Sequence, residues 1–89
     1  MSKYTFHTDP GHGWLEVSLE ELVRLGIADD ITAFSYQQGD KVFLEEDCDA
    51  GAFIKAKEAL GEAVEIVEKY KENTPIRGYA CFQFKKESR

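Results

Sequence analysis

Two histidines and an aspartate lie near the amino end of the sequence, at His7, Asp9 and His12, with Trp14 just beyond them. Two imidazoles and a carboxylate could bind a divalent metal ion or carry out acid–base catalysis. Their spacing matches none of the common zinc or calcium motifs. Asp9 also precedes Pro10 and two nearby glycines, which is typical of a turn. The sequence therefore leaves two alternatives: a small metal-binding or hydrolytic site, or an exposed turn.

Four carboxylates occur within five residues, at Glu45, Glu46, Asp47 and Asp49. A calcium-binding EF-hand would need acids at alternate positions, a central glycine and a distal glutamate, and these are missing. Carboxylates here could also favour the amino end of a following helix through its dipole. We expect either a solvated helix start or an acidic surface that contacts a basic partner, with a metal or catalytic role as a further alternative.

Cys48 lies inside this acidic run, where a thiol near the start of a helix could act as a nucleophile. The flanking Asp47 and Asp49 oppose that role, because negative charge disfavours the thiolate. Cys81 does not form a CxxC pair with Cys48, so we expect two reduced thiols. The sequence has no Gly-rich phosphate loop, Ser-His-Asp set or zinc spacing. We therefore predict no catalytic residue and no cofactor, and an interaction protein rather than an enzyme.

The charge of the chain is uneven along its length. Its 89 residues carry a net charge of −6. Residues 1–48 contain ten acids and three bases and so carry −7, whereas the seven acids and eight bases of residues 49–89 give +1. Phosphate contacts need clustered lysine and arginine, so direct nucleic-acid binding by the front half is disfavoured. A basic protein, such as a nucleic-acid-binding host protein, is an easier partner electrostatically.

Periodic patterns predict the elements that position these residues. Alternating apolar residues predict strands over residues 3–8, 14–17, 31–37, 41–46 and 77–84. Ser18 and Glu21 have the spacing of a capping box, which predicts a short helix over 19–25. Gly26 follows as a left-handed cap that ends this helix.

A longer apolar stripe at steps of three and four predicts a second helix over 50–71, capped by Asp47 or Asp49. Gly61 lies inside this span and should cost about 1 kcal/mol relative to alanine. The predicted order is β-β-α-β-β-α-β. We therefore expect residues 1–89 to form a single α+β domain, with a mostly antiparallel sheet and one short and one long helix on one face.

The sequence holds more aromatic residues than one helix can cover. These are Trp14, Phe34, Tyr36, Phe43, Tyr79, Phe82 and Phe84. Most should lie in the core or in cross-strand pairs. An exposed remainder would indicate a binding face or a homodimer.

The apolar runs are only a few residues long, and the first residues lack the apolar segment of a signal peptide. We therefore expect no membrane-spanning segment and a cytoplasmic location.

The segments DPGHGWLEV at Asp9–Val17 and GDKVFLEEDCD at Gly39–Asp49 resemble a family of short proteins of bacterial phages, plasmids and integrated elements. The resemblance covers about residues 5–55. It implies an accessory gene product but no catalytic residues, because the family has no assigned activity. With the acidic front half, it leads us to predict a protein that acts by protein–protein interaction, in an anti-defence role or as a nucleic-acid mimic. The metal-binding or hydrolytic domain remains the alternative.

Overall fold

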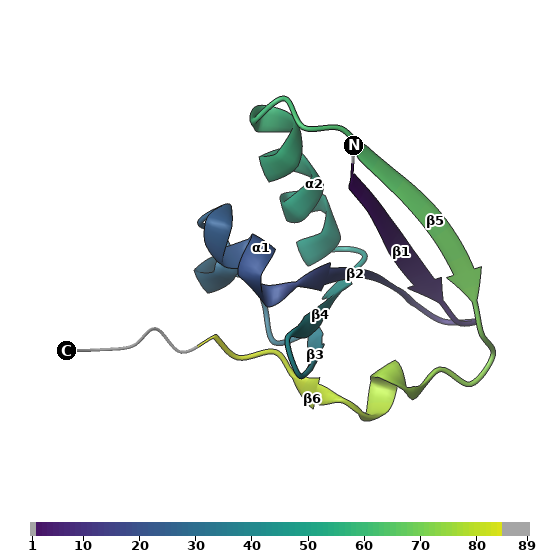
Figure 1. Ribbon diagram of the computed structural model, residues 1–89. Helices are drawn as coiled ribbons and strands as arrows, with labels where there is room; N and C mark the ends of the chain where they lie inside the picture. Colours follow the sequence, from purple (N-terminus) through teal and green to yellow (C-terminus); the bar gives the residue numbers. More distant parts are fainter. Residues whose placement is uncertain (1, 85–89) are drawn as a thin grey trace.

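Six strands form one mixed sheet in the computed structural model, which describes residues 2–84 (Figure 1). The strands are β1 (Ser2–Thr8), β2 (Gly13–Ser18), β3 (Tyr36–Gln38), β4 (Lys41–Glu45), β5 (Val64–Tyr70) and β6 (Ala80–Cys81). They lie side by side in the order β5-β1-β2-β4-β3-β6. Four of the five described pairings are antiparallel, and β1 pairs with β5 in parallel. The α+β class is confirmed, but the sheet is mixed and the predicted order lacks β5.

The first helix, α1 (Leu19–Arg24), forms where the capping signal predicts it. The amide of Glu21 donates to the Ser18 hydroxyl at 3.1 Å, which satisfies one of the free amides of the first turn. Gly26 follows the helix with a φ of 75°, a conformation that glycine adopts without steric cost. Ser18 and Gly26 thus bound α1 as the sequence predicts. The Glu21 carboxylate, however, bonds to Tyr4, Arg24 and Lys57 in place of the second arm of the capping box.

The second helix, α2 (Asp49–Ala59), also ends at a left-handed glycine, Gly61, with a φ of 73°. The amide of Gly61 donates to the carbonyl of Glu58 at 2.9 Å, and that of Glu62 donates to the carbonyl of Lys57 at 3.0 Å. This pair of bonds is a Schellman motif, which closes a helix. No helix within residues 2–84 is long and apolar enough to cross a membrane.

The helix predicted over 50–71 is therefore wrong in its second half, which is the strand β5. Its β-branched residues Val64, Ile66 and Val67 suit a strand better than a helix. Their spacing fits both periods, so the apolar stripe could not separate the two structures. Parallel pairing along the whole length of β1, with Tyr70 opposite Thr8, stabilises the extended form.

Two other predicted strands are shorter than expected. Most of 31–37 is a loop that leads into β3, because the Ser35 hydroxyl is buried and bonds to Asp49 on α2. The segment predicted as strand 77–84 begins in the 3-10 helix η2 (Pro75–Gly78), and only its two-residue β6 is extended in the sheet. Proline at the first position of η2 has the backbone angle that such a turn requires.

The two faces of the sheet differ in what covers them (Figure 1). Both α-helices pack on one face, where the main core lies, and another 3-10 helix, η1 (Ala28–Asp30), adjoins α1. The buried residues of this core include Leu15, Val17, Leu22, Val42, Leu44 and Phe53. The opposite face carries a smaller buried cluster of Trp14, Phe43 and Ile76, the last of which comes from η2. Because side chains alternate along a strand, successive residues of β2 point to opposite faces of the sheet.

A buried lysine connects the two helices to the sheet. Lys57 is 1% exposed, and its ammonium lies 2.7 Å from the Glu21 carboxylate and 2.8 Å from that of Glu62. The Tyr4 hydroxyl donates to Glu21 at 2.9 Å, and Arg24 pairs with both glutamates. Burial by itself would lower the pKa of Lys57, but the two carboxylates outweigh it and raise the pKa. Hydrogen bonds from Arg24 and Lys57 lower the pKa of Glu62 to about 2.

Acid should weaken this network. The pKa of Glu62 is lower in the folded chain than in the unfolded chain, so its contribution to stability is present above the unfolded pKa of about 4.3. That contribution is lost as the pH falls toward about 2. In thermal melts followed by circular dichroism, Glu62→Gln should lower the Tm at pH 7 and flatten its decline in acid. Glu58→Gln, at an exposed position of α2, is the control. Identical acid profiles for wild type and Glu62→Gln would contradict the role of this carboxylate.

Two glycines of the α2 region should respond in opposite directions to alanine. Gly61→Ala places a side chain in the left-handed region and should destabilise the fold by about 1 kcal/mol. Gly51→Ala lies inside α2 with open space around its Cα and should stabilise the fold by about 0.5–1 kcal/mol. Urea unfolding measures both changes. A neutral Gly61→Ala would show that the helix end does not depend on this glycine.

Candidate functional site

The helix-free face of the sheet carries two pockets beside η2, and they differ in charge. The first, here named the acidic pocket, has a volume of about 400 Å³. Trp14, Phe34, Tyr36, Glu45, Asp47 and Arg77 line it, together with His12 and Cys48. The second, named the basic pocket, has a volume of about 470 Å³ and is lined by His7, Lys41, Lys69 and Lys71 among others.

The acidic pocket brings together the two segments that the sequence singles out. Trp14 on β2 lies directly opposite Glu45 on β4. The amide of Glu46 continues this pairing and donates to the carbonyl of Gly13 at 3.1 Å. The turn before β2 and the acidic run after β4 therefore meet at one end of the strand pair.

Asp49 does not belong to the predicted acidic surface, because its side chain is buried and only 2% exposed. Its carboxylate accepts from the Thr32 amide at 3.0 Å, the Thr32 hydroxyl at 2.7 Å and the Ser35 hydroxyl at 2.5 Å. The Ser35 hydroxyl also accepts from the amide of Glu45 at 2.9 Å. Asp49 thus holds the loop over residues 31–35 against β4 and the start of α2.

The prediction that Asp47 or Asp49 caps α2 is also wrong. The cap residue is Cys48, which makes no side-chain capping bond. Instead, the Glu45 carboxylate accepts from the amides of Asp47 and Cys48 at 3.1 and 3.0 Å. Of the predicted acidic surface, Glu46 and Asp47 are exposed and Glu45 is half-buried.

The Cys48 thiol is exposed in this pocket but is not activated. Desolvation and the nearby carboxylates of Glu45, Asp49 and Asp47 raise its pKa above the ordinary value. Because the thiolate is the nucleophile, these surroundings oppose the catalytic role weighed for Cys48.

The two histidines of the predicted metal or catalytic site contact different residues, in different pockets. The Nε2 of His7 lies 2.7 Å from the Glu16 carboxylate in the basic pocket. The ring of His12 lies 6.0 Å from that of Trp14, at the acidic pocket. Among residues 2–84, no three His, Cys, Asp or Glu side chains are grouped so that they could hold a metal ion.

Asp9 pairs with an arginine that the sequence did not single out. Arg77 on η2 donates to its carboxylate at 2.7 and 3.1 Å, and the guanidinium also lies 5.4 Å from the centre of the Trp14 ring. The hydrogen bond from Arg77 is the main reason that the pKa of Asp9 lies well below its usual range. Amides of Gly11 and His12 donate to the same carboxylate. The partners are 68 positions apart in the chain, so no local signal marks this pair.

One aromatic ring of the acidic pocket is turned toward solvent. Phe34 is 70% exposed, whereas Trp14 is 2% exposed and forms an edge contact with Tyr36 at 6.2 Å. The other large exposed apolar residues of the described chain include Ile66, Val67 and Tyr70 of the edge strand β5. The homodimer remains a prediction.

No protein-family model matches this chain, and no match was found among curated proteins or among solved structures.

Loss of the Asp49 carboxylate should loosen the loop that carries Phe34. Asp49→Ala leaves the buried hydroxyl of Ser35 and the donors of Thr32 without their acceptor and should destabilise the fold by about 2–4 kcal/mol. Asp47→Ala removes an exposed carboxylate two residues earlier and should change stability by less than about 0.5 kcal/mol. Urea unfolding separates the two variants. Equal effects would mean that Asp49 does not hold the loop.

Proposed function

We propose that this chain is a small interaction protein of a bacterial mobile element, and that its acidic pocket receives a cationic side chain of a basic partner protein. The observation that supports this proposal is the exposed ring of Phe34 in the same pocket as the carboxylates of Glu45 and Asp47. An apolar ring left in water beside charged groups is typical of a binding surface.

Arginine is the side chain that suits this pocket best. A guanidinium stacks on an aromatic ring and binds a carboxylate through two parallel hydrogen bonds. The chain already uses this chemistry internally, since Arg77 lies over Trp14 and pairs with Asp9. A partner arginine would stack on Phe34 and pair with Asp47 in the same manner.

The charge of the front half supports the same class of partner. Residues 1–48 carry ten acids and three bases, which would attract a basic protein over a distance of about 10 Å at moderate salt. Nucleic-acid-binding host proteins carry such basic surfaces. In an accessory gene product, occupation of that surface would act as anti-defence or as mimicry of nucleic-acid charge.

The test uses a blocked tripeptide with a central arginine, followed by amide chemical shifts in solution. We expect the largest shifts at Phe34, Tyr36 and Asp47. The matched peptide with citrulline, which has the same shape without charge, should bind about tenfold more weakly. Phe34→Ala and Asp47→Asn should each weaken arginine binding several-fold, and Glu58→Gln on α2 should not. Equal binding of the two peptides, or shifts spread over all acidic segments, would refute the proposed pocket.

A further inference from the structure

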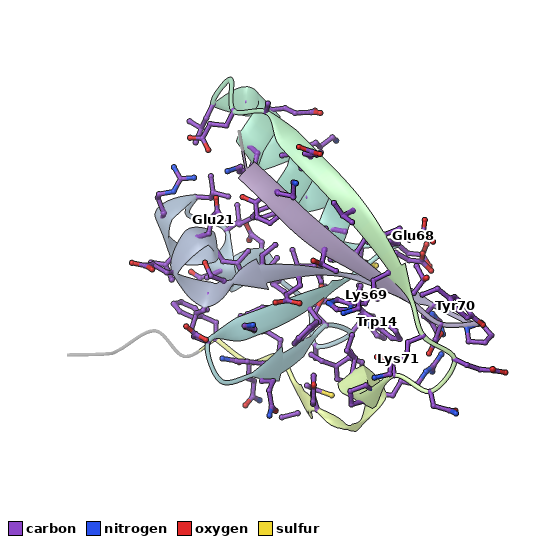
Figure 2. All side chains as sticks on the ribbon, turned by 45° about the vertical axis from the view of Figure 1, so that its right-hand side comes forward. Trp14, Glu21, Glu68, Lys69, Tyr70 and Lys71 are labelled. Atoms are coloured by element: carbon purple, nitrogen blue, oxygen red, sulfur yellow. The ribbon has the colours of Figure 1, made fainter. Side chains whose placement is uncertain are left out.

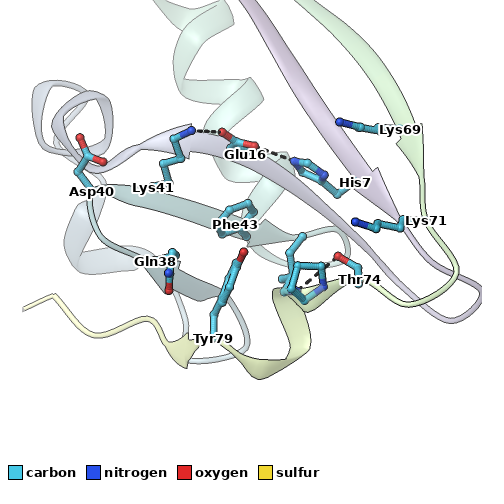
Figure 3. A pocket seen from close by; sticks show the side chains of 12 residues that line it. His7, Glu16, Gln38, Asp40, Lys41, Phe43, Lys69, Lys71, Thr74 and Tyr79 are labelled. Carbon is cyan, nitrogen blue, oxygen red and sulfur yellow. Dashed lines mark hydrogen bonds and ion pairs between the residues drawn. The ribbon is translucent and has the colours of Figure 1, made fainter.

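The basic pocket lies at the other charged end of the helix-free face, where β1, β2, β4 and β5 meet the chain around η2 (Figure 3). Its basic side chains come from three strands and the residue after β5: His7 from β1, Lys41 from β4, and Lys69 and Lys71 from the β5 segment. In a chain with a net charge of −6, such a gathering of bases is unusual. The separate strands show that the tertiary fold creates this cluster.

The parallel pairing of β5 with β1 places two of these lysines. Lys69 lies opposite His7, and the amide of Lys71 donates to the carbonyl of Thr8 at 2.9 Å. Residues two apart on a strand share a face, so both ammonium groups point to the pocket. Figure 2 shows them on the side of β5 nearer to Trp14, with Tyr70 on the other side.

Neither lysine has a carboxylate partner within residues 2–84. Glu16 on β2, the strand beyond β1, also lines the pocket, but its carboxylate already contacts His7 at 2.7 Å and Lys41 at 3.3 Å. Partial burial would raise the pKa of Glu16, yet the hydrogen bonds to His7 and Lys41 lower it, so this carboxylate stays ionised as their partner. Asp40 lies at the opposite end of the pocket from the two lysines (Figure 3). Two like charges therefore remain side by side, an arrangement that an anion would stabilise.

Aromatic rings form part of the wall of the pocket. The rings of Phe43 and Tyr79 lie 5.3 Å apart, and the ring of His7 lies 5.7 Å from Phe43. Tyr79 is half-buried, so part of its ring faces the pocket. Flat apolar groups beside positive charges suit a ligand that combines a planar ring with an anionic group.

We propose that the basic pocket binds a small phosphate ester of a planar ring, in the chemical class of the mononucleotides. Its phosphate would lie between Lys69 and Lys71, and its ring would lie against Tyr79. A phosphate monoester carries close to two negative charges at neutral pH and so matches two unpaired ammonium groups, whereas a carboxylate carries one. A volume of about 470 Å³ accommodates a ligand of this size. The proposal is independent of the acidic pocket.

Isothermal titration calorimetry with three probes tests this assignment: adenosine 5′-monophosphate, inorganic phosphate and adenosine. We expect the monophosphate to bind at least about tenfold more tightly than either of the other two probes, because only it engages both the lysines and the aromatic wall. Its affinity should fall as salt is raised. Equal affinity of the monophosphate and adenosine would overturn the role of the lysines, and equal affinity of the monophosphate and inorganic phosphate would overturn that of the ring.

Variants on exposed positions keep the fold intact and locate the site. The double variant Lys69→Gln/Lys71→Gln should lower the affinity for the monophosphate about tenfold or more, and Lys69→Arg/Lys71→Arg should retain it. Lys55→Gln, at an exposed position of α2, removes one charge elsewhere and should leave binding unchanged. Thermal melts confirm folding. Unchanged affinity in the glutamine variant with a native Tm would show that the ligand binds elsewhere.

Discussion

The ion pair between Asp9 and Arg77 holds the chain after β5 against the helix-free face of the sheet. This contact holds η2 against the sheet. Ile76 of η2 then packs with Trp14 and Phe43 and forms the buried cluster of this face. Both pockets share the segment around η2 as a wall.

The acidic and basic pockets lie on opposite sides of this buried cluster, because their charged residues come from different parts of the sheet. The end of β2 and β4 that carries Glu45 continues into the start of α2, whereas the edge formed by β1 and β5 carries Lys69 and Lys71. A chain with an overall negative charge can in this way offer one acidic and one basic site. Local charge, rather than the net charge, decides which ligand each site attracts.

Besides Asp9, two charged residues are buried, and both join elements in the interior. Asp49 ties the loop before β3 to α2, and Lys57 ties α2 to α1 and β1. A domain of 89 residues has a small core, so buried polar contacts with complete partners supplement apolar packing. The partners of Asp49 lie 17 and 14 positions earlier in the chain, so no local signal marks this carboxylate as buried.

The sequence by itself determined the local features: the hairpin of β1 and β2, and the capped start of α1 with its glycine end. These depend on contacts between residues close in the chain. Only the tertiary structure decided that Val64–Tyr70 is a strand, that Asp49 is buried and that Arg77 meets Asp9. Each of these depends on a partner far along the chain, and an apolar spacing that fits both helix and strand leaves that choice to the partner.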